Sequence, residues 1–489
     1  MKTRLIIIIM VFTTLLALSS QARVARDRIA VISDVHLLSP ELINPGSAID
    51  RADAVDSKMM VLSDEIMAAI TDSLIAMDPA VVLLTGDLTY NGERLSHQRM
   101  AWHLERLKRH GIQPLVIPGN HDCNNPFAKR YDGDKTEAVA TVNRDEFALI
   151  YKDCGYGEQS SRDPASLSYC CEPIPGIVII GIDSNMDELN TIVGRGDGAD
   201  SYHNGGRIKA QTLQWVIGQA TAARQQGKHV IAMMHHHLVP HFDHEDRLLA
   251  NYIVQDHDSI ARQLMHAGIH TIFTGHLHVT DVASMHDDTV ADSIVEVATG
   301  SAICYPFALR SVSINREDAI LDVDTRWLMS TNACPDLREQ GRQRIINATP
   351  GMASMLSNKA WSRVGGRMGQ LKAMIEMGGG KAHLPETPQQ ATQLVLRHLS
   401  EVLSRALLAV VEGDEQTTDT EALIEQGKQG IRAMIAEVAP DQADNLWDFF
   451  LDEVYPKLEP VVRSVLEDRN AVGSDTESRI GDLRVSTRL

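Results

Sequence analysis

Five short blocks of side chains that bind metal ions or move protons occur in order along the first 280 residues. They are Asp34-Val35-His36, Gly86-Asp87, Gly119-Asn120-His121-Asp122, His235-His236-His237 and Gly275-His276-Leu277-His278. Taken together they offer carboxylate, amide and imidazole groups, the mixed oxygen and nitrogen donors that Mn, Fe or Zn ions accept. Each block alone is weak, because such short patterns arise often by chance. Their common order along the chain predicts one shared metal site.

The donors suffice for two divalent ions, and the charge balance then points to phosphate. If Asp87 bridges the ions, Asp34 and Asp87 offset only half of four positive charges, so the pocket stays cationic. The whole chain carries a net charge of -19, from 46 basic and 65 acidic residues, and its aromatic content is 4%. This balance disfavours a nucleic-acid polymer as partner. A small phosphorylated substrate remains compatible with it, because the local cationic site acts at contact range.

The elements that must position these blocks form a layered α/β domain. Short apolar runs alternate with amphipathic stretches between residues 28 and 325, which is typical of strands covered by helices. We expect strands at 28–33, 80–85, 113–117, 176–182, 229–234, 271–274 and 294–298, and helices at 59–77, 93–110, 209–226 and 256–267. Every block follows one of these strands closely. Open α/β sheets place their sites at the carboxyl ends of strands, so the blocks should meet at one edge.

A second, helical domain is expected after the strand-like runs stop near residue 335. Val395, Leu399, Val402, Ala406 and Val410 lie on one helical stripe. We expect a helical accessory domain over 335–470, with prolines 456 and 460 breaking a helix. Residues 471–489 are polar and unpatterned, which predicts a flexible tail.

The N-terminus has the pattern of an export signal. Lys2 and Arg4 precede the apolar run Leu5 to Leu18, and Ala22 is the expected cleavage position. We therefore expect a signal peptide over 1–22, a periplasmic or extracellular protein, and no stable membrane insertion, since the apolar run is shorter than a spanning helix needs.

Six cysteines in an exported chain allow 15 disulfide pairings. One hypothesis pairs Cys154 with Cys170 or Cys171, which are near in sequence. The alternative is that all six are buried thiols.

The ordered set of five blocks resembles the signature of the calcineurin-like metallophosphoesterase superfamily. The resemblance covers about residues 28–325, within a catalytic domain expected over 28–330. It implies an α/β fold, a four-layer αββα sandwich, here followed by the C-terminal all-helical domain. It implies one ion held by Asp34, His36, Asp87 and His278, and a second held by Asp87, Asn120, His235 and His276. No ligand position departs from the pattern.

The resemblance also implies a mechanism. Two ions about 3.5 to 4 Å apart would lower the pKa of a bridging water, so that the hydroxide attacks phosphorus in line. We expect His121 to stabilise the transition state and protonate the leaving oxygen, with Asp122 orienting its ring or, alternatively, only capping the loop. For His236 we expect a substrate contact or a contact behind the metal ligands. Asn91 is expected to lie near the substrate.

A narrower resemblance indicates the substrate class. Residues 119–126, 151–156 and 166–169 resemble secreted bacterial phosphodiesterases of the cyclic-nucleotide type. We therefore expect hydrolysis of small phosphodiesters, with 3',5'-cyclic nucleotides among the candidates. Two alternatives stay open at this point: a phosphomonoesterase that scavenges phosphate from small metabolites, and a binding or adhesion module built on the metal domain. Metal identity and oligomeric state are left open as well.

Overall fold

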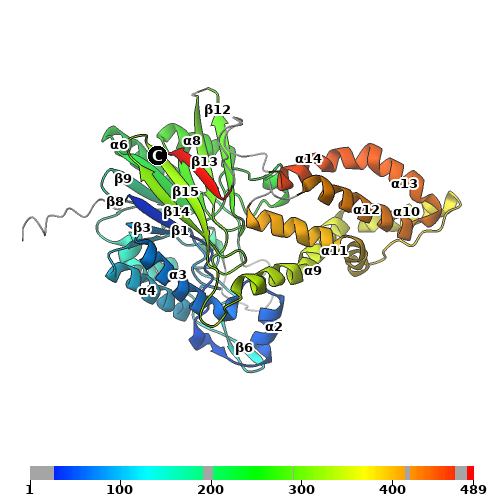
Figure 1. Ribbon diagram of the computed structural model, residues 1–489, viewed down its shortest axis with the longest axis horizontal. Coiled ribbons are helices and arrows are strands. Elements are labelled where there is room, and N and C mark those ends of the chain that lie inside the picture. Colours follow the sequence, from blue (N-terminus) through cyan, green and yellow to red (C-terminus); the bar gives the residue numbers. More distant parts are fainter. Residues whose placement is uncertain (1–26, 191–201, 290, 414–418, 468–481) are drawn as a thin grey trace, which may run out of the picture.

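Two mixed β-sheets face each other, built from the first 330 residues and one strand from the end of the chain (Figure 1). The structure is a computed structural model, and it describes residues 27–190, 202–289, 291–413, 419–467 and 482–489. The first sheet has the order β16-β15-β14-β1-β3-β4, with β1 Arg28–Ile32, β3 Val81–Leu84, β4 Gln113–Val116, β14 Ala308–Asn315, β15 Ile320–Trp327 and β16 Arg484–Arg488. Strands β1, β3 and β4 are parallel.

The second sheet has the order β12-β13-β11-β10-β9-β8-β7. Its strands are β7 Ser161–Arg162, β8 Tyr169–Ile174, β9 Ile177–Ile182, β10 His229–Met234, β11 Thr271–Thr274, β12 Asp281–Asp287 and β13 Asp292–Ala298. Strands β9, β10, β11 and β13 are parallel, so their carboxyl ends share an edge. A small third sheet joins β2 Ile43–Asn44, β5 Lys129–Asp132 and β6 Lys135–Ala138.

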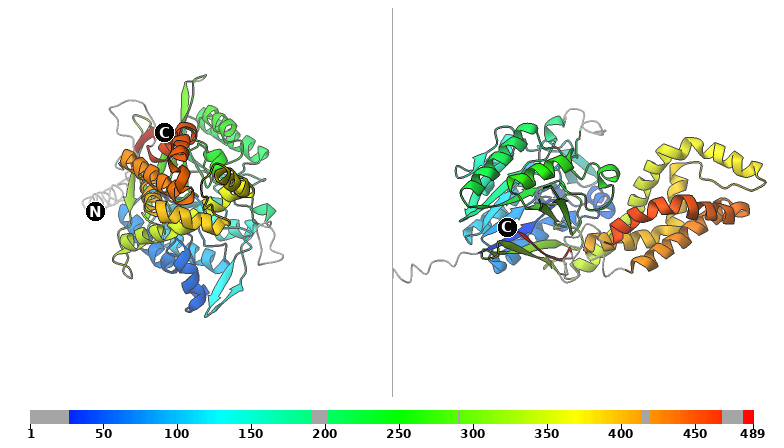
Figure 2. Two further views of the ribbon diagram at one scale, coloured as in Figure 1. Left: turned by 90° about the vertical axis from the view of Figure 1, so that its right-hand side faces the viewer. Right: turned by 90° about the horizontal axis from the view of Figure 1, so that it is seen from above.

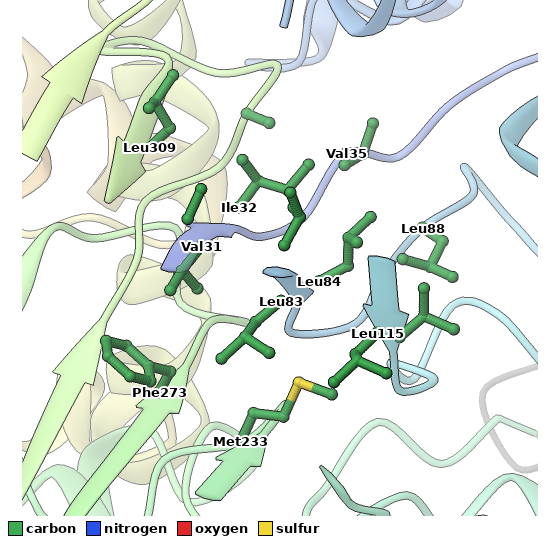
Figure 3. Close-up of a cluster of buried hydrophobic side chains, with 14 of the residues drawn as sticks. Val31, Ile32, Val35, Leu83, Leu84, Leu88, Leu115, Met233, Phe273 and Leu309 are labelled. Atoms are coloured by element: carbon green, nitrogen blue, oxygen red, sulfur yellow. The ribbon is translucent and has the colours of Figure 1, made fainter. Parts of the chain in front are cut away.

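Helices cover the outer faces of both sheets. Helices α3 (Ser63–Met77) and α4 (Arg94–Arg109) pack on the first sheet, and α6 (Ala210–Gln225) and α8 (His257–Ala267) on the second. Between the sheets, Figure 3 shows Leu83 and Leu115 beside Met233 and Phe273. Because both faces of the sheets are covered, the central strands are continuous apolar runs rather than alternating ones. The four-layer arrangement expected from the sequence is confirmed.

The helical region follows β15 and extends away from the sandwich (Figure 2). It contains α9 Leu337–Val364, α10 Met368–Met377, α11 Pro388–Glu412, α12 Thr420–Val438, α13 Ala443–Phe449 and α14 Tyr455–Leu466. Pro456 stands at the start of α14 and Pro460 inside it, so neither ends the helix as predicted. The remaining helices are α2 Ser47–Val55, α5 Arg144–Ile150 and α7 Glu245–Leu248. In the described ranges, no helix is long and apolar enough to cross a membrane.

The helical region packs on the sandwich through apolar and polar contacts. Leu337, Ile345, Leu408 and Val411 belong to the same buried apolar cluster as the first sheet, and Arg344 Nη1 donates to the carbonyl of Asp53 at 2.7 Å. The hydroxyl of Tyr305 donates to the carboxylate of Glu412 at the end of α11. The backbone N–H of Asp243, in the loop after β10, donates to Ser464 Oγ in α14 at 3.0 Å.

The last residues of the chain form a strand, so the prediction of a flexible tail over 471–489 is wrong for this part. Residues 468–481 lie outside the described residues, but β16 pairs antiparallel with β15 from Ile320↔Arg488 to Asp324↔Arg484. Val485 and Thr487 are buried in alternation with exposed neighbours, which is the period of an edge strand. The sequence did not predict this strand, because an alternation of five residues is short and the surrounding sequence is polar.

Two other predictions concern the signal peptide and the disulfide bond. The predicted signal peptide lies outside the described residues. All six cysteines are described and none is bonded to another, so the pairing of Cys154 with Cys170 or Cys171 is wrong. Burial raises the pKa of the Cys154 and Cys171 thiols to about 12, which keeps both protonated at neutral pH.

Candidate metal centre

The carboxyl ends of strands from both sheets meet and bring the five blocks together. The N–H of His36 donates to the carbonyl of Asp87 at 2.8 Å, which joins the loops after β1 and β3. Across the sheets, the N–H of His276 donates to Asp34 Oδ2 at 2.9 Å. The loops that carry the predicted ligands are therefore fixed to each other by hydrogen bonds from backbone N–H groups, one to a backbone carbonyl and one to the Asp34 carboxylate.

The first group of ligand atoms contains Asp34, His36 and His278. The Nε2 atoms of the two histidines lie 3.1 Å apart, and Asp34 Oδ1 lies 3.2 Å from His278 Nε2 and 3.7 Å from His36 Nε2. Donor atoms bound to one ion at about 2.1 Å lie about 3.0 Å apart where the ligands stand at right angles and about 3.4 Å apart in a tetrahedron. The group therefore fits a common ion.

The second group contains Asp87, Asn120, His235 and His276. His235 Nε2 lies 3.4 Å from Asp87 Oδ2 and 3.0 Å from Asn120 Oδ1. The Nδ1 atom of His235 donates to the carbonyl of Thr85 at 2.8 Å, which leaves Nε2 for an ion. An atom of His276 lies within 4.8 Å of these ligand atoms.

Asp87 joins the two groups. Its Oδ2 atom is also 3.6 Å from His36 Nε2, so one carboxylate faces ligand atoms of both groups. Seven predicted ligands thus form two adjoining clusters that share Asp87, and the donor set fits two ions.

The backbone is strained at five of the seven predicted ligands. Positive φ angles, of 40° to 70°, occur at Asp34, His36, Asp87, His276 and His278. Residues other than glycine rarely adopt this region, at a cost of about 1 to 3 kcal/mol each, and such residues cluster at functional sites. The strain is evidence for function that is independent of the residue types.

Glycines precede several ligands because the chains approach closely. A Cβ atom on Gly119 would lie 2.1 Å from Asp87 Oδ1, and one on Gly275 would lie 2.4 Å from Asp34 Oδ2. Both distances are far below van der Waals contact. These glycines let neighbouring loops close over the carboxylates.

Electrostatics prepares the carboxylates for cations. Burial raises the pKa of Asp34 and Asp87, but the neighbouring histidines outweigh it and hold both values below the usual range. Burial lowers the pKa of His235 and His278, but Asp87 and Asp34 raise these values to about 9 and about 10. Without ions, therefore, the carboxylates are ionised and these two imidazoles carry protons that a metal must displace.

His121 lies beside both clusters with a fixed ring orientation. Its Nδ1 atom lies 2.7 Å from the carbonyl oxygen of Tyr90 and 3.0 Å from Asn91 Oδ1. Nδ1 therefore carries the proton, and Nε2 lies 4.0 Å from Asp87 Oδ2 with the side chain 26% exposed. Asn91, predicted near the substrate, thus helps to position His121.

Asp122 does not orient His121, and that part of the prediction is wrong. Its carboxylate accepts hydrogen bonds from the N–H groups of Leu88, Thr89 and Gly119 at 3.0, 2.9 and 2.8 Å, and from Thr89 Oγ1 at 2.8 Å. The side chain therefore ties the loop after β4 to the loop after β3. The geometry favours the alternative in which Asp122 caps the loop. Adjacent side chains along an extended loop point in different directions, so the Asp122 carboxylate does not face the His121 ring.

His236 is held by the protein at both ring nitrogens. Nδ1 lies 2.8 Å from Ser184 Oγ and Nε2 lies 3.2 Å from the carbonyl oxygen of Asn204. Its ring centroid is 4.5 Å from that of His276. This arrangement favours a positioning contact behind the predicted ligand His276 over a substrate contact.

Three nearby residues were not predicted. Tyr202 accepts a hydrogen bond from Asn120 Nδ2 at 2.6 Å, and its ring lies 6.1 Å from that of His121 and 5.2 Å from that of Phe127. Lys58 Nζ lies 3.7 Å from Asp56 Oδ1. The pKa of His121 is lowered first by burial and, to a smaller extent, by the charge of Lys58. Tyr202 lies in the Gly- and Asp-rich sequence 186–207, which has no helical or strand periodicity, and the length of such a stretch is a signal of function. Nothing in the sequence pointed to Lys58.

Comparison with known proteins agrees with the clusters. Residues 27–280 match the calcineurin-like phosphoesterase family. No protein with a curated description matches the sequence.

Solved structures similar to this chain include three hydrolases. A dimetal phosphatase from Danio rerio has a TM-score of 0.42 and 12% identity, over 62% of this chain and 96% of that one. Purple acid phosphatase PPD1 from yellow lupin seeds has a TM-score of 0.36 and 10% identity, over 62% and 51%. The sulfate thiohydrolase SoxB from Thermus thermophilus has a TM-score of 0.32 and 14% identity, over 62% and 56%.

Proposed function

The chain belongs to the calcineurin-like phosphoesterase family, and from this premise we propose that it is a dimetal phosphodiesterase acting on small phosphodiesters, 3',5'-cyclic nucleotides among them. The observation that carries the proposal is the pair of clusters that share Asp87, with His121 beside them. Each cluster gathers buried donor atoms at the spacing of metal ligands, which is the arrangement that a metal site requires.

The protein residues would divide the work as follows. Asp34, His36, Asp87 and His278 would hold one ion, and Asp87, Asn120, His235 and His276 the other. When bound, two divalent ions supply Lewis-acid stabilisation of the phosphoryl oxygens and lower the pKa of water.

His121 would serve the leaving group. The carbonyl of Tyr90 holds the Nδ1 proton, so Nε2 is the ring atom that faces the reacting phosphate. A proton held at Nε2 stabilises the equatorial oxygens and passes to the leaving oxygen as the ester bond breaks. Burial lowers the pKa of His121, and the negative charge of a bound phosphoester acts in the opposite direction.

The surroundings of His121 favour a diester over a monoester. Phe127 and Tyr202 form an aromatic pair on one side of it, which offers apolar surface to a second ester substituent. Lys58 forms an ion pair with Asp56, so its charge adds less to the binding of a dianionic monoester than a free lysine would.

The first test compares two esters on the same protein. After chelation and return of Mn²⁺, the enzyme should hydrolyse bis(p-nitrophenyl) phosphate in preference to p-nitrophenyl phosphate, and Asp87→Ala should hydrolyse neither. A preference for the monoester would replace the proposal by the phosphatase alternative. Absence of metal-dependent turnover on both would favour a binding role.

A second test isolates His121. His121→Ala should lower kcat by about 100-fold or more, the usual size of a general-acid contribution, while the bound metal content stays unchanged. His110→Ala is a matched control, because His110 is an exposed residue beyond α4. Equal turnover of His121→Ala and the wild type would remove the residue from the mechanism.

We also infer that the protein is exported. The support is the basic start, the apolar run Leu5 to Leu18 and the small residues up to Ala22. The mature protein should begin at Arg23 when its mass is measured after expression in a bacterial host, and an intact Met1 in the secreted fraction would contradict this.

A further inference from the structure

A second set of metal-ligand side chains lies apart from the seven described above. His237 follows β10, His241 lies in the next loop, and Glu296 is on β13. Ligand atoms of the three lie within 4.8 Å of one another, and their side chains are at most 1% exposed. None of them takes part in the proposed hydrolysis.

Both histidines are oriented as metal ligands usually are. His237 Nδ1 donates to Glu245 Oε1 at 2.8 Å. Asp281 Oδ2 lies 3.0 Å from His241 Nδ1 as an ion pair, without the geometry of a hydrogen bond. A carboxylate at one ring nitrogen fixes the imidazole and leaves the other nitrogen for an ion. A carboxylate therefore faces Nδ1 of each ring, and the two ring centroids are 4.2 Å apart.

The two Nε2 atoms lack ordinary partners. His237 Nε2 is buried and has no hydrogen-bond partner in the described part of the chain. His241 Nε2 lies 3.3 Å from Glu296 Oε1, which equals the spacing of about 3.3 Å between ligands of a tetrahedral ion with bonds near 2.0 Å. A buried nitrogen without a partner is costly unless something binds it.

The carboxylates are held in place and need positive charge. Glu296 Oε2 accepts hydrogen bonds from the N–H groups of Leu238 and Val239 at 2.7 and 2.6 Å. Glu245 Oε2 accepts one from the N–H of His241 at 2.7 Å. Glu245 and Glu296 are both fully buried, and buried carboxylates are retained only with compensating charge.

We propose that His237, His241 and Glu296 bind a third divalent transition-metal ion, with Zn²⁺ the best match to two imidazoles and one carboxylate. The ion ties the loop after β10 to β13. That loop begins with His235 of the dinuclear centre, and its far end contacts α14 through Asp243 and Ser464. The third ion is therefore structural. By holding this loop in place, it stabilises both the position of His235 in the dinuclear centre and the contact of Asp243 with the helical region.

The rival occupant is a proton. An imidazolium at His241 between Asp281 and Glu296 would supply one positive charge without any metal. The number of bound ions distinguishes the metal ion from the proton. If His241 is protonated instead of bound to metal, the third ion is absent and the count falls to two.

The experiment uses the full-length protein stripped with a chelator and reloaded with Co²⁺. Unbound metal is removed, metal per chain is counted by mass spectrometry, and the visible spectrum is recorded. The wild type should hold about three ions, one of which has the intense bands of tetrahedral Co²⁺. His241→Gln should hold about two and lose those bands, while the matched control His286→Gln, at an exposed histidine, should match the wild type.

Two further measurements keep the result independent of folding and of the proposed hydrolysis. Asp34→Asn should lower the metal count at the dinuclear centre but retain the tetrahedral bands. His237→Gln is a second variant if His241→Gln does not fold. A wild-type count of two without tetrahedral bands, or equal counts in the wild type and His241→Gln, would overturn the proposal even if the enzyme hydrolyses diesters as expected.

Discussion

Gly119→Ala tests how tightly the loops close over the shared carboxylate. The added Cβ atom would lie 2.1 Å from Asp87 Oδ1 and 2.3 Å from the Asp87 backbone nitrogen. Since ordinary contact begins at 3.4 Å, the carboxylate must move by 3.4 - 2.1 = 1.3 Å. Metal–ligand distances tolerate shifts of only about 0.2 Å. A rotation of the Asp87 side chain would not relieve the clash, because the backbone nitrogen is also too close.

We therefore expect Gly119→Ala to lose metal at both clusters and to lower kcat/KM for the diester by at least about 100-fold, the loss typical of a 1 Å misplacement. Metal content after reloading and the kinetics of bis(p-nitrophenyl) phosphate hydrolysis check this. Gly218→Ala is the control, since a Cβ there meets nothing within 4 Å on helix α6, and it should be active and slightly more stable. Wild-type metal content and turnover in Gly119→Ala would refute the close-approach argument.

Three further predictions concern protons and stability. Metal uptake by the stripped protein at pH 7.5 should release about two protons, from His235 and His278 with pKa values of about 9 and about 10; calorimetry in buffers of different ionisation enthalpy measures this, and no release would show that both rings are neutral. Burial raises the pKa of Glu93 to about 7 in the folded chain, above its unfolded value, so this residue makes stability fall as the pH rises from about 4.5 to 7. Glu93→Gln should then be more stable than the wild type by up to about 3 kcal/mol at pH 8, and lose most of this advantage by pH 5 in urea unfolding. Asp122→Asn should lower the free energy of unfolding by about 1 to 3 kcal/mol, because one of its N–H donors then faces an amide hydrogen; a drop in kcat at unchanged stability would instead restore its predicted catalytic role.

The sequence was sufficient to predict which loops meet. Each block follows an apolar run, and the ends of parallel strands share an edge, so the order of the blocks predicted the gathering of Asp34, Asp87 and His235 without any knowledge of distances. The family resemblance placed His235 among the ligands and His236 outside them. In the structure His235 Nε2 lies 3.4 Å from Asp87 Oδ2, whereas the ring nitrogens of His236 contact Ser184 and Asn204.

The sequence did not predict the direction in which side chains in the loops point. Asp122 is adjacent to His121 yet bonds to the neighbouring loop, and Asn91, distant in sequence, contacts the His121 ring. The positive φ angles of the ligands are likewise set by the closure of loops from two sheets, which no local pattern records. The strand β16 was missed for a different reason, since its pairing partner β15 lies across the whole helical region.

Strand β16 makes the helical region an insertion within the first sheet rather than an appendage after it. Cutting the chain near residue 330 would expose the edge of β15 as an unpaired, aggregation-prone template, and would take away the Asp482 carbonyl that accepts from the buried guanidinium of Arg310. Because β15 and β16 are antiparallel neighbours, the end of one lies near the start of the other. Removing the helices and joining Trp327 to Asp482 through a short turn would therefore keep β15 and β16 paired. The same change would take Leu337, Ile345, Leu408 and Val411 out of the buried apolar cluster of the first sheet, so the shortened protein should be less stable than the full chain.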